Sequence, residues 1–238
     1  MAIKPMKWSR GKSLCTYCGV HVATTGDHVV PDCLYTEEER RAIPNLMTVP
    51  ACADCNVDKS RYDAPLQHYL LVHVDRSNHP QAQQVFGTSM QTAVITNRVR
   101  LLDRFYEGAV VPEFTPNGIY LGDNYAIPID FEPVRRGLVY LVRGLHSSVL
   151  GEVKRDDEVG VKVIERDQRE AFTASFIKLG LEDWHPQGDQ FAAAWVSWGA
   201  THVYWLVEFF KAVQFLGRSA KTHPLYGPPV PQDLTRSS

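Results

Sequence analysis

Hydrophobic and polar residues alternate in different ways along the chain, and the first sixty residues have a pattern of their own. Residues 20–30 favour an extended strand, and residues 45–50 favour a second, shorter strand. Between them, Thr36 and Glu39 have the spacing of a capping box, which predicts a short helix over residues 36–42. The start of the chain is therefore expected to hold two strands and a short helix.

Beyond this part, the pattern predicts helices and strands in mixed order. They are helices over 51–61, 64–74 and 81–106, a hairpin of 118–121 with 125–129, a helix over 131–150, a strand over 159–164, a helix over 167–179, a hairpin of 191–198 with 201–209, and a strand over 212–216. The first hairpin is expected to turn at Gly122, Asp123 and Asn124. Helices and strands in this order indicate an α+β fold.

The cysteines suggest a division of the chain. All five lie between Cys15 and Cys55, and none follows. We therefore expect an N-terminal module over residues 1–63 and a larger mixed α+β domain over residues 64–238. The larger domain has no comparable cluster of chemically reactive residues. Its expected roles are substrate selection, oligomerisation or regulation.

Composition and charge limit the classes of function. The net charge of −2 gives no bulk attraction to nucleic acid, so such a partner would need local clusters of lysine and arginine. No apolar run is long enough to span a bilayer, and the N-terminus lacks the apolar stretch of a secretory signal. We therefore expect a cytoplasmic protein with no membrane partner.

Four cysteines have the spacing of a metal site. Cys15 and Cys18 are separated by two residues, as are Cys52 and Cys55, and each pair can direct two thiolates at one ion. A disulfide framework fits poorly with an odd number of cysteines in an intracellular chain, and a redox pair does not require two copies. We expect structural Zn²⁺, because four thiolates leave no coordination position for water. Cys33 is expected to be a buried thiol.

The residues around the cysteines resemble a known family of nucleases. Asp27 and His28 stand between the two cysteine pairs, Asn45 precedes the second pair, and Asn56 follows it. Residues 13–61 resemble the zinc-containing branch of the HNH endonucleases, whose pattern runs C-x-x-C, D-H-I/V-x-P, N-L, C-x-x-C-N-x-x-K. The resemblance implies a ββα-metal fold, in which a hairpin carries the D-H pair and a helix begins at the last motif.

The resemblance also implies a role for each residue. His28 is the expected general base, because a histidine is largely neutral at pH 7 and can take a proton from water. Asp27 and Asn56 are the expected ligands of a catalytic Mg²⁺ or Mn²⁺ ion, since both offer oxygen donors. Asn45 is expected to hold the loop that orients His28. Because adjacent strand residues point to opposite faces, Asp27 and His28 can serve one site only at a distorted strand end.

The expected function is that of a divalent-metal-dependent endonuclease that cuts DNA. Lys59 lies three residues after Asn56, on nearly the same face of a helix, and Lys59 and Arg61 are expected to contact the nucleic acid. Two alternatives stay open: a non-catalytic zinc ribbon that binds nucleic acid or protein, and a nuclease that acts on RNA. A ribbon needs the cysteines but not Asp27, His28 or Asn56, and competition between DNA and RNA would separate the second alternative.

Overall fold

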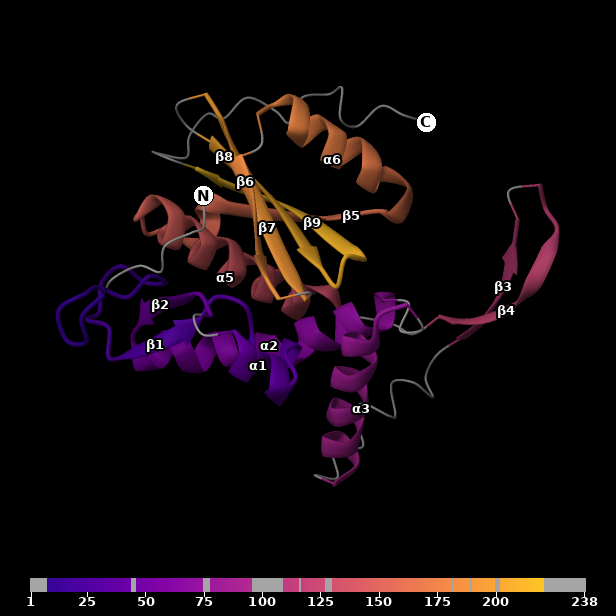
Figure 1. Cartoon of the computed structure of the whole chain (residues 1–238), viewed down its shortest axis with the longest axis horizontal. Helices are drawn as coiled ribbons and strands as arrows, with labels where there is room; N and C mark the ends of the chain where they lie inside the picture. Colours follow the sequence, from indigo (N-terminus) through magenta and orange to yellow (C-terminus); the bar gives the residue numbers. More distant parts are fainter. Residues whose placement is uncertain are drawn as a thin grey trace.

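The computed structural model of the chain describes residues 8–43, 46–74, 78–95, 109–115, 117–126, 130–180, 182–188, 190–199 and 202–220. Within these ranges the fold is mixed α+β, as the sequence predicts (Figure 1). Its largest sheet is antiparallel and has five strands in the order β5-β9-β8-β7-β6. The strands are β5 (Val159–Ile164), β6 (Glu182–Gln187), β7 (Phe191–Trp198), β8 (His202–Phe209) and β9 (Val213–Ala220). Short 3-10 turns are η1 (Asp32–Leu34), η2 (Asp156–Glu158) and η3 (Arg166–Gln168).

Three consecutive strands form the centre of this sheet. β7 and β8 pair along their whole length, from Phe191 opposite Phe209 to Trp198 opposite His202, and β9 returns beside β8. The predicted hairpin and the strand after it are thereby confirmed. The hydrophobic pattern does not predict the edge strand β6, because it is largely polar, contains Pro186 and pairs on one side only.

Helices cover both faces of the sheet. α5 (Phe131–Leu150) lies across one face and α6 (Arg169–Lys178) across the other (Figure 1). α5 has the bounds that the sequence predicts. Asp130 caps its start by accepting a hydrogen bond from the Glu132 amide, and Gly151 ends it in a left-handed conformation with φ 72°. Within the described ranges, no helix has both the length and the apolar composition to cross a membrane.

The main apolar core lies between the sheet and α5. Trp205 and Phe215 of the sheet are fully buried there with Leu138 of α5. A smaller cluster on the opposite face gathers around Phe172 and Phe176 of α6. Because both faces of the sheet are covered, β8 is buried along nearly its whole length and reads as an almost continuous apolar run.

The N-terminal residues form a two-stranded sheet followed by a long helix. β1 (Thr25–His28) pairs in antiparallel fashion with β2 (Thr48–Ala51). Helix α1 (Glu37–Ala42) lies between them in sequence and begins with the predicted capping box. α2 (Ala53–His73) follows β2 directly and packs against α5. The order of these elements is therefore strand, short helix, strand, long helix.

Helix α2 replaces the two helices that the sequence predicts over residues 51–61 and 64–74. Pro65 lies inside it and removes one backbone hydrogen bond, yet the helix continues because its next turns are anchored by buried residues such as Leu66. The boundary expected after residue 63 falls inside this helix. The main core includes residues from both sides of that point.

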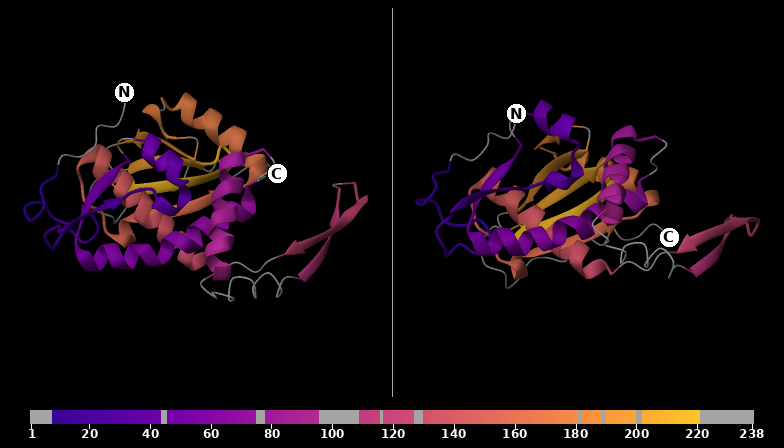
Figure 2. Two further views of the ribbon diagram at one scale, coloured as in Figure 1. Left: turned by 60° about the horizontal axis from the view of Figure 1, so that its bottom comes forward. Right: turned by 90° about the horizontal axis from the view of Figure 1, so that it is seen from below.

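Helix α3 (Pro80–Ile95) and a hairpin extend away from this body. The hairpin pairs β3 (Ala109–Phe114) with β4 (Tyr120–Ala126), and Figure 2 shows it standing clear of the sheet and the other helices. Its turn lies between the two strands, where Gly118 has φ 81°, so the turn predicted at residues 122–124 is wrong. The remainder of the helix predicted up to residue 106 lies outside the described residues.

Candidate metal centre and active site

The four cysteines of the predicted zinc site lie together where the N-terminal loop meets α2. Cys15 and Cys18 flank a tight turn before β1, whereas Cys52 immediately precedes α2 and Cys55 lies in its first turn. Their Sγ atoms lie within 4.8 Å of one another. Gly19, with φ 66°, closes the turn by donating its amide to the Cys15 carbonyl at 2.8 Å. A cluster of this kind can hold one metal ion such as zinc.

Burial and backbone amides shift the pKa values of these thiols in opposite directions. Burial raises the pKa of Cys18, but the backbone N–H groups of His21 and Val20 contribute to a net lowering of that pKa to about 6. The pKa of Cys55 is raised, first by burial and then by its cysteine neighbours. One thiolate is thus favoured by the turn, whereas further thiolates repel one another unless a cation binds them. The donor set fits a divalent ion with an affinity for sulfur.

Cys33 stays apart from the cluster. Its Sγ lies 3.8 Å from the backbone oxygen of Asp63, and burial raises its pKa to about 12. It is therefore a protonated thiol at neutral pH. Because Cys33 is a cysteine that lies outside the four-cysteine cluster, its substitution provides a control for experiments on the cluster.

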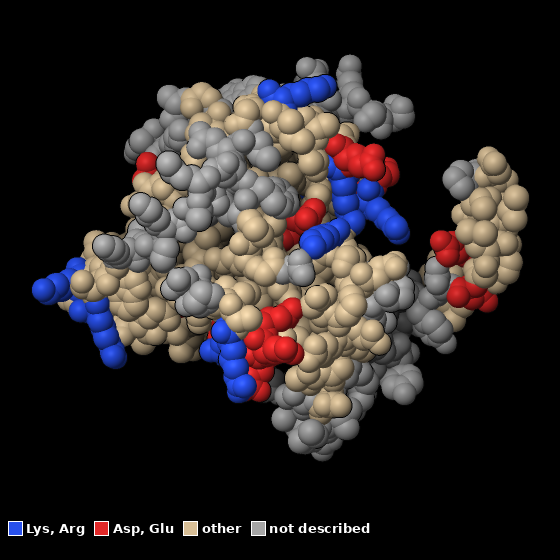
Figure 3. Space-filling model, viewed as in Figure 1, with Lys and Arg blue, Asp and Glu red and all other residues tan. Residues whose placement is uncertain are grey.

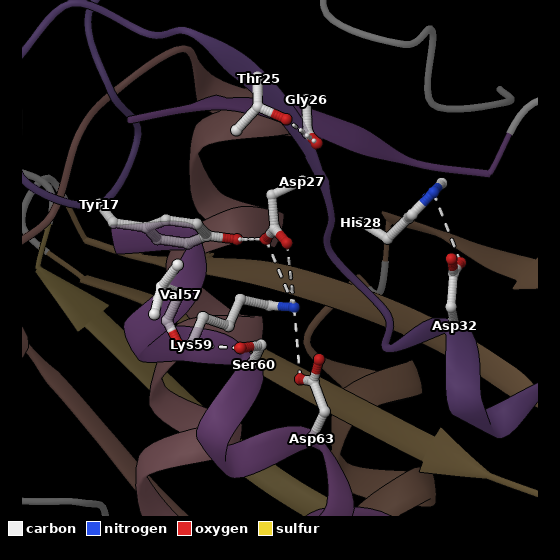
Figure 4. A network of polar contacts seen from close by, with 10 residues as sticks. All are labelled: Tyr17, Thr25, Gly26, Asp27, His28, Asp32, Val57, Lys59, Ser60 and Asp63. Atoms are coloured by element: carbon white, nitrogen blue, oxygen red, sulfur yellow. Dashed lines mark hydrogen bonds and ion pairs between the residues drawn. The ribbon is translucent and has the colours of Figure 1, made fainter. Parts of the chain in front are cut away.

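The side chain of Asp27, a residue of β1, is buried in a network of polar side chains (Figure 4). Its carboxylate accepts a hydrogen bond from the Tyr17 hydroxyl at 2.5 Å. The Lys59 ammonium lies 3.4 Å from Oδ1 and 3.3 Å from Oδ2 of Asp27, and 3.4 Å from Oδ1 of Asp63. Burial raises the pKa of Tyr17 well above its usual value and also raises the pKa of Asp63. The tyrosine therefore remains a donor, and one ammonium group is shared by two carboxyl groups.

His28 faces away from this network. Figure 4 shows the Asp27 and His28 side chains on opposite sides of β1, as regular strand geometry requires. Nε2 of His28 lies 3.4 Å from Oδ1 of Asp32, whose Oδ2 pairs with Arg40 at 3.0 Å. Nδ1 of His28 is buried and has no hydrogen-bond partner among the residues that the structure describes. The structure therefore does not bring the two residues of the D-H pair to one site.

The expected ligands of the catalytic ion are not gathered either. Asn45 lies outside the described residues, so its predicted support of His28 stays a prediction. Asn56 lies in the first turn of α2 with a half-buried side chain. Both carboxylate oxygens of Asp27 contact the Lys59 ammonium. In this arrangement Asp27 does not fit a hard divalent ion, which could bind there only if Lys59 moved.

The two basic residues expected to contact nucleic acid differ in exposure. The Lys59 side chain is 3% exposed, so the phosphate contact expected of it conflicts with its burial. Its ammonium instead neutralises the carboxyl groups beneath β1. The Arg61 side chain is 69% exposed and pairs with Asp58 at 3.4 Å. Arg61 thus lies at the surface, where a phosphate can reach it.

Three residues that contact Asp27, His28 or Lys59 are not part of the family pattern. Asp63 lies four residues after Lys59, a helical spacing that could have signalled the pair. Asp32 lies four residues after His28, but the turn after β1 sets their approach, so spacing alone does not predict it. Tyr17 reaches Asp27 only through the tertiary fold and leaves no signal in the sequence.

Comparisons of the chain with known proteins give no relatives. No family model, curated protein or solved structure matches it. What bears on function is therefore the set of residues and contacts described above.

Proposed function

We propose that the protein is a divalent-metal-dependent endonuclease of the HNH type that hydrolyses phosphodiester bonds of DNA. One observation carries the proposal. β1 and β2 form an antiparallel pair that leads directly into α2, and four cysteines gather where the loop, the second strand and the helix meet. The resemblance of residues 13–61 likewise implies two paired strands before a helix, although here α1 lies between the strands in sequence.

The four-cysteine cluster is proposed to bind Zn²⁺ and to act structurally. Four thiolates complete a tetrahedral shell, so the ion has no open position for water or substrate. Its role would be to fix the start of α2 against the loop before β1. The chemistry would then take place at other residues.

His28 is the proposed general base. It takes a proton from water, and the resulting hydroxide attacks phosphorus. The bond from phosphorus to the 3′ oxygen breaks, and this oxygen takes a proton from solvent, which gives a 5′ phosphate and a 3′ hydroxyl. The carboxylate of Asp32, 3.4 Å from Nε2, would orient the ring, and Arg40 would hold that carboxylate in place. This orientation leaves the buried Nδ1 as the nitrogen that accepts the proton, so the proposal requires water to reach Nδ1. Asp32 is thus a proposed positioning residue.

A Mg²⁺ or Mn²⁺ ion is part of the proposal because the resemblance implies it. Such an ion would stabilise charge on the phosphate and on the leaving oxygen. Since Asp27 is paired with Lys59, we assign no step to the ion and no ligand beyond the expectation for Asp27 and Asn56. A Lys59→Met variant tests that expectation, because removal of the ammonium should tighten binding of Mn²⁺ if Asp27 is a ligand.

Cleavage of supercoiled plasmid tests the proposal. The zinc-loaded full chain is incubated with Mg²⁺ or Mn²⁺, with and without a chelator, beside His28→Ala and a matched control, His79→Ala, whose residue immediately precedes α3. We expect nicked or linear plasmid from the wild type and from His79→Ala, and cleavage by His28→Ala that is slower by at least about 100-fold. Binding without cleavage by the wild type would favour the zinc-ribbon alternative, and competition by RNA alone would favour an RNA-directed nuclease.

A further inference from the structure

A short turn near the start of the chain, residues 8–12, is called the N-terminal turn below. It is fixed by hydrogen bonds to the segment that leads into β1. Gly11, with φ 77°, donates its amide to the Ala23 carbonyl at 3.0 Å, and the Ala23 amide donates to the Ser13 carbonyl at 2.8 Å. Ala23 lies two residues before β1 begins. The turn therefore has a defined position relative to this strand.

Trp8 places the N-terminal turn on the same face of β1 as His28. Residues 26 and 28 are two apart in a strand, so their side-chain positions share one face. A Cβ atom at Gly26 would lie 3.0 Å from Cζ2 of Trp8, which means that the indole covers this position. Asp27 points to the opposite face. The turn therefore borders the proposed general base and not the buried ion pair.

The N-terminal turn carries two basic side chains without acidic partners. Arg10 and Lys12 are exposed, and neither forms an ion pair with a residue that the structure describes. Residues 1–26 contain no aspartate or glutamate. At the left of Figure 3, where the N-terminal loop lies in Figure 1, basic side chains stand out with no acidic side chain beside them. Arg40 and Arg61, in contrast, pair with carboxylates. Exposed cations without acidic neighbours attract anions.

We propose that the N-terminal turn binds the phosphate backbone of the nucleic acid beside the bond to be cut, and that Arg10 and Lys12 each contact one phosphate. The inference rests on the proposed function, because it names the surface by which the same site holds its substrate. Contacts of lysine and arginine with phosphate oxygens position a nucleic acid without reading its sequence. Since Lys59 is buried, the turn supplies the phosphate contact that the sequence pattern assigned to Lys59.

Binding of the zinc-loaded full chain to a labelled DNA duplex at several salt concentrations tests the proposal, without Mg²⁺ or Mn²⁺ so that the duplex stays intact. Each phosphate contact contributes about −0.9 to the slope of log affinity against log salt. The Arg10→Gln, Lys12→Gln double variant should bind on the order of 10–100-fold more weakly at about 0.1 M salt, with a slope that is shallower by about 2. The Lys162→Gln, Lys178→Gln control loses the same charge from exposed positions on β5 and α6 and should bind as the wild type does.

Acetylation of lysines gives a second readout that requires no variant. Bound duplex should protect Lys12 from the reagent and leave Lys162 reactive. Wild-type affinity and slope in the double variant, an equal loss in the control, or no binding by the wild type would overturn the proposal. A Lys12 that stays equally reactive would do so too.

Failure of this proposal is distinguishable from failure of the nuclease proposal, because binding and cleavage are measured separately. A wild type that binds the duplex through Arg10 and Lys12 but leaves plasmid uncut with Mg²⁺ or Mn²⁺ would support the binding surface and contradict the nuclease. A wild type that cuts plasmid while the double variant binds normally would support the nuclease and overturn the binding surface.

Discussion

The β1–β2–α2 module and the five-stranded sheet are held together by different interactions. The sheet buries large side chains on both faces, with Trp205 and Phe209 fully buried beneath α5. The module has only two short strands, and its centre holds four cysteines and the buried ion pair of Lys59 with Asp27. The stability of the module should therefore depend on a bound ion and on paired charges, whereas that of the sheet should depend on apolar packing.

The two regions meet along α5. Gly144 of this helix lies against Val29, which follows β1 in sequence. Arg143 donates hydrogen bonds to the backbone oxygens of Tyr17 and Lys154. The module thus packs on the same helix that covers the sheet. A substitution that destabilises one region is therefore expected to destabilise the other through these contacts.

The largest predicted effect concerns the cysteine cluster. Cys15→Ser should remove a zinc ligand, and metal binding in small zinc modules contributes on the order of 10 kcal/mol to folding. Hydrogen exchange should show β1, β2 and the start of α2 losing protection while β7, β8 and β9 keep theirs. Cys33→Ser is the control and should leave zinc content and protection unchanged. Equal zinc content and melting of Cys15→Ser and the wild type would contradict the structural site.

Lys59→Met should have the next largest effect on stability. It leaves the buried carboxylate of Asp27 and the partly exposed carboxyl group of Asp63 without their shared ammonium, which should lower the free energy of unfolding by about 3–5 kcal/mol. Arg61→Met removes the exposed ion pair with Asp58 and should lower the free energy of unfolding by less than about 1 kcal/mol. Urea unfolding of the two variants measures the difference, and similar midpoints would show that the Lys59 pair is not essential to the module.

Gly144→Ala tests the contact between the two regions. A Cβ atom at this position would lie 2.9 Å from Cγ1 and 3.0 Å from Cγ2 of Val29. Overpacking should lower the free energy of unfolding by about 1–3 kcal/mol. The higher helix propensity of alanine should offset about 1 kcal/mol of this loss. The Gly144→Ala, Val29→Ala double variant should recover stability relative to Val29→Ala alone. Additive losses in a double-mutant cycle would mean that the two residues do not couple the regions.

The smallest predicted effect is a weakening of the sheet in acid. His146 of α5 is fully buried, and its Nδ1 lies 2.7 Å from the Ser219 hydroxyl of β9. This burial lowers the pKa of His146 from its usual value of 6.5, with Lys154 acting in the same direction and Glu152 opposing both. Below pH 6.5 the unfolded chain therefore binds a proton that the folded chain resists, so stability falls as the pH decreases. His146→Gln should flatten the dependence of the melting temperature on pH between neutrality and the acid range. An unchanged slope would rule out this histidine as its source.

The sequence predicts some elements well because their signals are local. The α5 helix has a regular apolar period, a capping Asp130 and a terminal Gly151, and its predicted bounds match. The turn of the β3–β4 hairpin is not predicted, because residues 122–124 have the same turn-forming composition as the residues around Gly118. The choice between them depends on strand register, which the local sequence does not fix.

The candidate site shows the same limit. The spacing of the cysteines is enough to predict that they gather. The adjacent positions of Asp27 and His28 are not enough to predict a shared site, because strand geometry turns their side chains apart. The pairing of Lys59 with Asp27 joins β1 to α2, and such contacts between distant segments require the tertiary fold.

The rate of plasmid cleavage per zinc-loaded molecule, measured for the wild type and His28→Ala, shows whether His28 acts as the general base. Both proteins should contain one zinc ion and melt at the same temperature, because the His28 side chain lies outside the cysteine cluster and the buried ion pair. We expect His28→Ala to cleave at least about 100-fold more slowly than the wild type, because a general base usually contributes this much. Equal rates at equal zinc content would contradict it.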